Sequence, residues 1–381
     1  MRSTSLRVLT IAHNAVAASN RARVDALRRL PGVEVQLLTP PWWFEEGRRV
    51  AAASASDPAW RVGPTLFTGN GSRHVYASGL VEAIKGTRPD VIDLFEEPFT
   101  LVALQTLVLR NALAPRAALV FYSAVNVERH WRWPYRTIER AVMRSADGAH
   151  APSADVPPIL RARGLMQDRP VAVIPLGVDV NGFASAEPMP LPDIPRPRIG
   201  FVGRFEPVKG LDVLLEAARR LSTSASLVLV GDGSQRDALR GDGVHVLSSV
   251  AYEQVPSLLK ALDVLVLPSV TILPLHREQF GRVLAEAMAA GVPVIGTTSG
   301  AIPEVIGDAG IVVPERDPAA LAQALDALLT RAELRQRCIA AGQERARRTF
   351  DWPNVASQTL ALFQSAVAQR RSVRALEVAR A

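Results

Sequence analysis

Two glutamates eight residues apart are the first candidates for chemistry. Glu278 and Glu286 stand in the stretch EQFGRVLAEAMAAGVPVIGT, residues 278–297. If both were helical, they would be about 12 Å apart along the axis and offset by about 80°, so they would not form a paired acid–base dyad. Because carboxylates are pure hydrogen-bond acceptors, two acids at this spacing can bind opposite ends of a long polar ligand. The alternative is structural, with each acid capping or flanking a core helix.

Two cations lie on a loop that opens a helix. In GFVGRFEPVKGLDVLLEA, residues 200–217, a strand ends at Gly203, Arg204 and Lys209 follow, and a helix starts near residue 210. Cations beside a helix N-terminus, with glycines that let the backbone approach a ligand, predict an anion site that a diphosphate would suit. The alternative is two ordinary solvated cations on a loop.

A second strand ends in Gly-Asp-Gly. The stretch LVLVGDGSQRDAL, residues 227–239, turns at Gly231 into a helix, but it lacks the full dinucleotide-binding fingerprint. A structural turn is therefore the favoured interpretation, and the lining of a nucleotide pocket is the alternative. The six histidines are scattered along the chain, and no cluster with metal-ligand spacing is visible.

Alternating strand and helix patterns predict the scaffold that positions these residues. Near-continuous apolar runs, typical of parallel strands buried on both faces, occur at 6–12, 33–39, 90–95, 118–123 and 171–175. The stretch EPMPLPDIPRPR, residues 187–198, holds five prolines and predicts a linker. Six more runs follow, at 198–203, 226–231, 244–249, 263–269, 292–297 and 310–314. The pattern predicts two doubly wound α/β domains, with a ligand at the carboxyl ends of the strands in a cleft between the domains.

Bulk composition agrees with a globular protein of more than one domain. The chain has 381 residues, of which 48% are hydrophobic and 21% charged. Cys338 is the single cysteine, no signal peptide is recognisable and no apolar run is long enough to span a membrane, so we expect a cytoplasmic protein. The net charge of +7 would suit contact with phosphates, nucleic acid or an anionic membrane, or it reflects an Arg-rich genome.

Four motifs carry a family resemblance. In their order and spacing, GRFEPVKG, LVGDGSQRDAL, DVLVLPS and EQFGRVLAEAMAAGVPVIGT resemble those of the family-4 retaining glycosyltransferases of GT-B fold. The resemblance is strong over residues 197–355, which include TSGAIPEVIGDAGIVVP at 298–314, and looser before them. It implies an acceptor-binding Rossmann-like domain over 1–188 and a nucleotide-sugar-binding one over 189–356, with a last helix, about 357–381, packing back on the first domain.

The resemblance also implies an activity and residue roles. The activity is transfer of a sugar from a nucleoside-diphosphate sugar, of UDP or GDP type, to an acceptor with retention, without a metal or other cofactor. Arg204, Lys209 and Glu278 would be the catalytic set: the two cations would hold the diphosphate, and Glu278 would bind sugar hydroxyls. Glu286 would bind the ribose. The other implied donor-binding residues are Gly203, Gly231, Ser249, Val250, Phe280, Gly281 and Arg282. In this family the leaving phosphate can take the acceptor's proton, so no separate base is expected.

The first half departs from the family at its acceptor side. Where relatives have a glycine-rich loop, this chain has IAHNAVAASNRARVDAL, residues 11–27, without a glycine. Where many relatives have a histidine, the alignment gives Val125, with His130 farther on. The glutamates at 96 and 97 end a strand, where acids can bind acceptor hydroxyls, orient a nucleophile or complement a helix dipole. The acceptor-side candidates are His13, Asn14, Glu96, Glu97, Asn126 and Glu128.

Several alternatives stay open. The stretches PPWWFEEGRRV, residues 40–50, and RHWRWPYR, residues 129–136, combine Trp with Arg, which suits a membrane-interfacial or sugar-stacking surface or a partly buried acceptor loop. The expected partners are the nucleotide-sugar donor and a sugar, lipid-linked or small-molecule acceptor, with peripheral contact at the inner face of a membrane as an open alternative. A sugar-nucleotide epimerase or another enzyme of this fold is the alternative function. A basic nucleic-acid-binding protein is the remote one, and no recognition motif supports a nucleic-acid partner.

Overall fold

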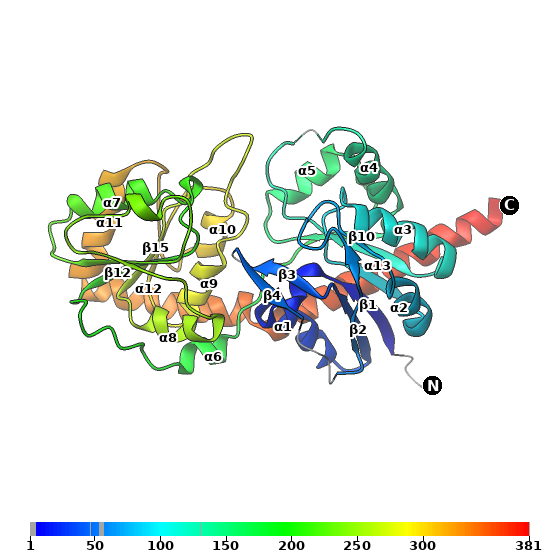
Figure 1. Cartoon of the computed structure of the whole chain (residues 1–381), viewed down its shortest axis with the longest axis horizontal. Helices are drawn as coiled ribbons and strands as arrows, with labels where there is room; N and C mark the ends of the chain where they lie inside the picture. Colours follow the sequence, from blue (N-terminus) through cyan, green and yellow to red (C-terminus); the bar gives the residue numbers. More distant parts are fainter. Residues whose placement is uncertain (1–4, 46, 53–56, 130, 381) are drawn as a thin grey trace. The chain divides into compact units, whose positions relative to one another are not determined.

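The protein is described from a computed structural model (Figure 1), over residues 5–45, 47–52, 57–129 and 131–380, with side chains to residue 373. Two residues of the Trp- and Arg-bearing stretches, Glu46 and His130, lie outside the described residues. The chain divides into two compact units: Met1–Ile174 with Val355–Ala381, and Pro175–Asn354. Each unit is described by itself.

The first unit is built on a seven-stranded parallel sheet. Its order is β11-β10-β9-β8-β1-β2-β5, and the strands are β1 (Leu6–Ile11), β2 (Val33–Thr39), β5 (Trp60–Val62), β8 (Val91–Leu94), β9 (Ala118–Tyr122), β10 (Gly148–Ala151) and β11 (Val171–Val173). The chain winds outward from β1 through β2 to β5, then returns to the other side of β1 and winds outward from β8 to β11. The point at which the direction reverses therefore lies between β1 and β8, and such points are where doubly wound sheets bind ligands.

Helices cover both faces of this sheet (Figure 1). They are α1 (Ala18–Arg28), α2 (Leu80–Thr87), α3 (Leu101–Leu113), α4 (Tyr135–Ser145) and α5 (Val156–Ala162). A 3₁₀ turn, η1 (His13–Val16), follows β1 directly. Between β2 and β8 the chain also forms two small antiparallel hairpins, β3 (Trp42–Glu45) with β4 (Arg48–Ala51), and β6 (Thr65–Leu66) with β7 (Val75–Tyr76).

The second unit has a six-stranded parallel sheet of order β14-β13-β12-β15-β16-β17. The strands are β12 (Arg198–Val202), β13 (Ser226–Val230), β14 (Val244–Leu247), β15 (Val264–Leu267), β16 (Val294–Thr297) and β17 (Ile311–Val313). The helices are α6 (Val180–Ser185), α7 (Leu211–Arg219), α8 (Val255–Lys260), α9 (Arg282–Ala289), α10 (Ile302–Ile306), α11 (Pro318–Thr330) and α12 (Ala332–Arg345). The winding direction of this sheet reverses between β12 and β15.

The sequence-based strand predictions are confirmed for all eleven apolar runs, and two strands of the large sheets were missed. β10 reads Gly-Ala-His-Ala, which contains no β-branched residue and no long apolar run. It becomes a strand because it lies between β9 and β11, with Ala149 and Ala151 fully buried. β5 is three residues long and pairs at the edge with β2.

The proline-rich segment 187–198 is not the linker that the sequence predicted. The chain passes between the units at Ile174–Pro175, before the predicted boundary at 188/189. Ile194 is 6% exposed in the core of the second unit, and the backbone N–H of Met189 donates to the Ser257 carbonyl at 2.8 Å. Prolines exclude a helix here, but they do not prevent an extended segment from packing on a core.

The second crossing between the units lies in the last helix, α13 (Trp352–Arg380). Its Phe363 and Ala366 are fully buried, and the Arg370 guanidinium donates to the Pro115 carbonyl at 2.7 and 3.2 Å. Phe363 and Ala366 therefore belong to the packing of the first unit although they come from the end of the chain. None of the described helices, α13 included, is both long and apolar enough to cross a membrane.

Candidate functional site

Loops at the carboxyl ends of β12, β13 and β15 approach one another closely in the second unit. Gly231 has φ of 152°, and a Cβ there would collide with the carbonyl oxygen of Gly203. Gly210 has φ of 65°, and a Cβ there would collide with the carbonyl oxygen of Pro268, just after β15. These two glycines are thus required for the loops to pack, which supports the structural interpretation of the Gly-Asp-Gly turn.

A buried polar cluster lies where the sheet winding reverses. Lys209 Nζ is 2.6 Å from Glu278 Oε2, and the Ser269 hydroxyl donates to the same oxygen at 2.7 Å. The side chains of Lys209 and Glu278 are only 14% and 8% exposed. Burial opposes the charge on Glu278, but Lys209 and Ser269 outweigh it and hold the pKa of that carboxyl below its usual value. The carboxylate is therefore ionised at neutral pH and paired with Lys209.

Glu278 lies outside the helix that follows it. α9 begins at Arg282, and Gly281 is its N-cap with φ of 78°. The axial separation worked out for two helical glutamates therefore does not apply. The Phe280 ring is 4% exposed and meets Phe350 edge-on at 5.8 Å, so only its backbone can face a ligand. The N-cap Gly281 has no side chain to bond the first N–H groups of α9, and the N-terminus of a helix is the dipole end that suits an anion.

Glu286 lies within α9 and is 5% exposed. The Tyr252 hydroxyl donates to its Oε1 at 3.2 Å. Burial and the neighbouring carboxylate together raise the pKa of Tyr252, so this hydroxyl stays a donor throughout the physiological range. Glu278, with Lys209 and Ser269, and Glu286, with Tyr252, therefore have separate partners.

The other predicted donor-side residues are more open. Arg204 is exposed, directly after Gly203 at the end of β12. Ser249 and Val250 are half-buried and follow β14, the outermost strand on the other side of β13. Arg282 is half-buried in the first turn of α9. All of these residues lie on the carboxyl-end side of the sheet, where doubly wound folds bind their ligands.

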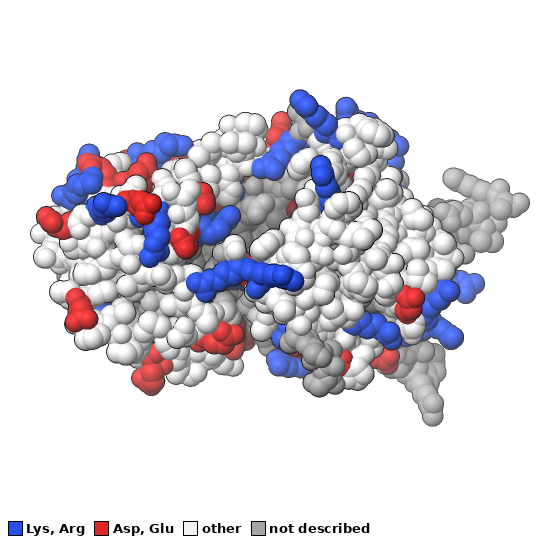
Figure 2. Space-filling view, viewed as in Figure 1, with Lys and Arg blue, Asp and Glu red and all other residues white. Residues whose placement is uncertain are grey.

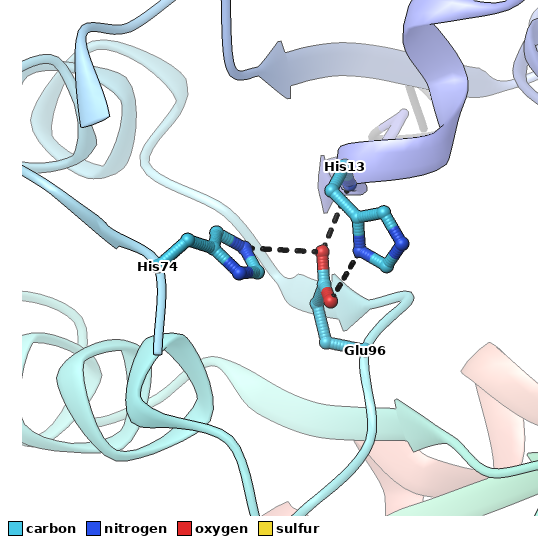
Figure 3. A group of neighbouring side chains, drawn as sticks. All are labelled: His13, His74 and Glu96. Carbon is cyan, nitrogen blue, oxygen red and sulfur yellow. Dashed lines mark hydrogen bonds and ion pairs between the residues drawn. The ribbon is translucent and has the colours of Figure 1, made fainter. Parts of the chain in front are cut away.

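The first unit has its own polar cluster at the reversal point of its sheet (Figure 3). His13 follows β1, Glu96 follows β8, and His74 precedes β7. His13 Nδ1 lies 2.6 Å from Glu96 Oε2, and His74 Nε2 lies 3.7 Å from Glu96 Oε1. The interpretation that the histidines are scattered is therefore wrong for these two, because the fold brings together residues that are far apart in the sequence.

Glu97 turns toward the next strand. Its carboxylate accepts from the Ser123 hydroxyl at 2.7 Å and from the Ala124 N–H at 2.8 Å, just beyond β9. Burial raises the pKa of Glu97 to about 7, although the two hydrogen bonds act against that rise. Part of the Glu97 population is thus protonated at neutral pH.

The remaining acceptor-side candidates are not drawn into one site. Asn14 is half-buried in η1, and its carbonyl accepts from the Asn20 side chain at 3.1 Å. Asn126 is 2% exposed, whereas Glu128 is exposed.

Glu128 lines a cavity of about 280 Å³ together with Arg129, Trp131, Arg136, Glu139, Arg140, Ile159, Ala162 and Arg163. Lys and Arg side chains gather over α4 and α5 on this part of the surface (Figure 2).

A buried network lies beneath the first-unit cluster. Asp93 in β8 accepts from the Arg23 guanidinium at 2.7 and 3.2 Å and from the Thr10 hydroxyl at 2.9 Å. Burial opposes the Asp93 charge, but Arg23 and His150 overcome it and hold the pKa of that carboxyl well below its usual value. The network ties α1 to β1 and β8, the strands that precede His13 and Glu96.

Sequence reasoning missed three residues of these clusters. His74 comes from a hairpin whose strands are only two residues long, Ser269 is a lone serine after a predicted strand, and Tyr252 lies in a short 3₁₀ turn. No local pattern distinguishes them from ordinary loop residues. Only Ser269 had a usable signal, because it follows the strand beside β12 at the reversal point of the sheet.

Two family models match the chain. The one described as Glycosyltransferase Family 4 matches residues 19–181, and the one described as Glycosyl transferases group 1 matches residues 196–331. A phosphatidyl-myo-inositol mannosyltransferase of Mycobacterium leprae is 36% identical over 207 residues, which cover 50% of this chain and 53% of that protein. A D-inositol 3-phosphate glycosyltransferase of Xylanimonas cellulosilytica is 34% identical over 238 residues, covering 56% of this chain and 55% of that protein. The chain thus spans about half the length of these curated relatives.

Solved structures share the whole fold. Sucrose-phosphate synthase from Thermosynechococcus elongatus superposes with a TM-score of 0.69 at 20% identity, covering 95% of this chain and 99% of that one. HepE of Anabaena, solved in complex with UDP and glucose, gives a TM-score of 0.66 at 17% identity, covering 94% and 100%. These likenesses show that the two Rossmann-like units form a GT-B fold.

Proposed function

Since the chain belongs to the family-4 glycosyltransferases, we propose that it transfers a sugar from a nucleoside-diphosphate sugar to an acceptor hydroxyl with retention of anomeric configuration. The observation that carries the proposal is the cluster of Lys209, Ser269 and Glu278 at the reversal point of the second sheet, with Glu278 just before the start of α9. This is a partly buried cation paired with a buried anion at the position where the fold binds ligands. Such a pair suits a substrate that carries both phosphate and hydroxyl groups.

In this proposal the diphosphate binds between Arg204, Lys209 and the first N–H groups of α9. When the bond from the sugar to the phosphate breaks, negative charge grows on the leaving nucleoside diphosphate. Fixed cations and helix amides stabilise that charge without having to reorganise. The proposal therefore requires no metal ion, because the two side-chain cations do the corresponding work.

The two glutamates have different parts in the proposal. Glu278 accepts from hydroxyls of the donor sugar, beside the backbone of Phe280 and Gly281. Glu286, oriented by Tyr252, accepts from the ribose hydroxyls. Gly203, Gly231, Ser249 and Val250 line the nucleotide, with the last two beside the base, and Arg282 lies at the N-terminus of α9, the end that binds an anion. The acceptor, whether a sugar, a lipid-linked molecule or a small molecule, binds to the first unit, and contact with a membrane surface is part of the proposal only for a lipid-linked acceptor.

A thermal-shift panel of nucleoside diphosphates and nucleotide-sugars tests the proposal first, since a ligand that binds only the folded state raises the melting temperature. We expect one diphosphate and its sugar conjugate to raise it. The matching donor is then incubated with candidate acceptors and the product followed by NMR, which reports the anomeric configuration. Conversion of the donor sugar without any acceptor would indicate an epimerase instead. No shift with any nucleotide, in a protein that melts cooperatively, would overturn the proposal.

A further inference from the structure

An apolar groove lies on the first unit, between α2, α3 and the hairpin strand β7. Its volume is about 470 Å³. Its apolar lining includes Val75 of β7, Leu80 and Val81 of α2, and Leu101, Leu104 and Val108 of α3. Val108 is 57% exposed, so the groove is open to solvent. A contiguous apolar surface of this kind marks a place where an apolar ligand or partner binds.

The polar side chains of the lining are mostly bound to the protein's own backbone. The Gln105 side chain accepts from the Tyr76 N–H at 2.9 Å and donates to the Tyr76 carbonyl at 2.7 Å. The Tyr76 hydroxyl is buried and donates to the Leu38 carbonyl at 3.4 Å. These bonds leave the groove with little to offer a polar ligand, because a buried polar group without a partner is costly. The lining therefore suits an alkyl chain.

Arginines lie close to the β7 side of the groove. Arg73 is exposed, precedes Val75 by two residues, and donates from Nε to the Tyr135 hydroxyl at 3.3 Å. Arg132 and Arg136 are exposed as well. The backbone N–H of Arg136 donates to the Arg132 carbonyl at 3.2 Å, so these two residues are one turn apart around Tyr135. Three guanidinium groups in one region attract a phosphate or another anion.

An exposed tryptophan lies in the same segment. Trp133 is 83% exposed, more than any other large apolar side chain in the part of the chain that the structure describes. Indole rings are favoured at the level of lipid head groups, where the apolar ring and the polar N–H both find partners. Single-stranded nucleic acid also uses Arg and Trp, but it stacks its bases on aromatic rings and has no use for an aliphatic groove. The combination therefore favours a lipid.

We propose that this groove binds one molecule of an anionic lipid. The alkyl chain lies along Val81, Leu104 and Val108, and the anionic head group lies at Arg73 and Arg136. The inference goes beyond the proposed function, because the site belongs to the first unit alone and needs no nucleotide.

Alkyl phosphates below their critical micelle concentrations are the probes, because each presents one chain and one phosphate. Isothermal titration calorimetry with the full chain measures their affinities. Decyl phosphate should bind about tenfold more tightly than octyl phosphate, since each buried methylene contributes roughly three- to fourfold. Decyl maltoside, which has the chain without the charge, should bind about tenfold more weakly than decyl phosphate. No binding of monomeric decyl phosphate, or equal affinities for the two chain lengths, would overturn the proposal.

Val108→Glu tests the groove, and Leu113→Glu is its matched control on α3. Both residues are exposed, Val108 by 57% and Leu113 by 37%, but Leu113 does not line the groove. Val108→Glu should weaken the binding of decyl phosphate by about tenfold or more, whereas Leu113→Glu should change it by less than about twofold. Val81→Gln, on the wall that α2 forms, is a second variant with the same expected direction. Unchanged affinity in folded Val108→Glu and Val81→Gln would contradict the site.

The head-group assignment has its own variants. Arg73→Gln and Arg136→Gln should each weaken decyl phosphate by roughly three- to tenfold and change decyl maltoside by less than about twofold. Arg144→Gln, an exposed arginine two turns farther along α4 and about 12 Å from Arg136, is the control and should change neither. An equal loss for both ligands would mean that the arginines support the local structure, which would overturn the assignment.

Other occupants give other results, and each would overturn the inference. A dimer that sedimentation velocity detects and that Val108→Glu dissociates would make the groove an interface between two copies of the chain. Binding to phosphatidylglycerol vesicles without binding of monomeric decyl phosphate would indicate only adsorption to a charged surface. The proposed function is tested separately: a protein that binds a nucleotide-sugar but no decyl phosphate refutes the inference alone, and the reverse result refutes the proposed function alone.

Discussion

Replacing Glu278 by Gln is expected to tighten the binding of a free nucleoside diphosphate. In the unliganded protein, Lys209 Nζ lies 2.6 Å from Glu278 Oε2, so a diphosphate must share this cation with a carboxylate. An argument from the sequence alone predicts no change in the affinity for the diphosphate, because Glu278 would contact only the sugar, which the free diphosphate lacks. The ion pair with Lys209 instead predicts that this affinity rises when the carboxylate charge is removed.

The size of the effect follows from the charge separation. A phosphate oxygen about 2.8 Å beyond Lys209 would lie roughly 5.4 Å from the carboxylate. Coulomb's law gives a repulsion of about 3 kcal/mol at an effective dielectric constant near 20 and about 0.8 kcal/mol in bulk water. Removing the carboxylate charge should therefore tighten binding by about 1–3 kcal/mol, or from fivefold to more than 100-fold.

Isothermal titration calorimetry with the nucleoside diphosphate measures this change directly. Glu286→Gln is the contrasting variant and should weaken binding by about 1–3 kcal/mol, because a charged hydrogen bond to the ribose is lost. Glu216→Gln, an exposed glutamate of α7 paired with Arg219 and Arg220, is the matched control and should leave the affinity unchanged. A folded Glu278→Gln protein that binds the diphosphate as the wild type does, or more weakly, would refute the reasoning that Lys209 is shared between the two anions.

Three further predictions concern the charged groups of both units. Arg204→Ala and Lys209→Ala should each lower turnover by roughly two to three orders of magnitude, as expected when one stabiliser of a developing charge is lost, and near-normal steady-state rates in both would contradict the phosphate site. Activity should survive excess EDTA, and a loss of activity that Mg²⁺ or Mn²⁺ restores would show that a metal is needed. Since the pKa of Glu97 is raised to about 7, its contribution to stability is present below about pH 4.5 and is lost as pH rises through about 7. Glu97→Gln should therefore raise the free energy of unfolding by roughly 1–3 kcal/mol at pH 8 and leave it unchanged at pH 4.5. Urea denaturation at both pH values checks this, with the exposed Glu128→Gln as control, and equal stabilisation at both would contradict the assignment.

The scaffold was predictable where the sequence carries a local pattern. Runs such as VEVQLLT and SLVLVG are β-branched and apolar, and they become β2 and β13 within a residue of the expected bounds. β10 lacks such residues, and only its neighbours in the sheet make it a strand. The proline-rich segment led to a misplaced domain boundary. Its composition shows that the segment cannot form a helix, but it does not show that the segment packs against the core of the second unit.

The site was predictable in part, for a related reason. Lys209 and Glu278 follow strands that are adjacent in a doubly wound sheet, so their approach follows from topology once the strands are recognised. The pairing of His13 with Glu96 joins residues 83 positions apart, and His74 enters from an insertion that no fold rule anticipates. Their contact depends on how the hairpin folds over the sheet, and that information is not present in any short window of sequence.

The position of α13 affects the order in which the protein can fold during synthesis. The second unit is one continuous segment, Pro175–Asn354, and all of it is synthesised before the buried Phe363 and Ala366 of α13. The first unit contains the earliest residues of the chain, but its core is complete only when α13 has been synthesised and has packed against it. A chain released early, after Asn354, would hold a complete second unit and an incomplete first one with apolar surface uncovered, which is the kind of species that aggregates. The first unit, whose synthesis begins first, is thus the last to complete its core.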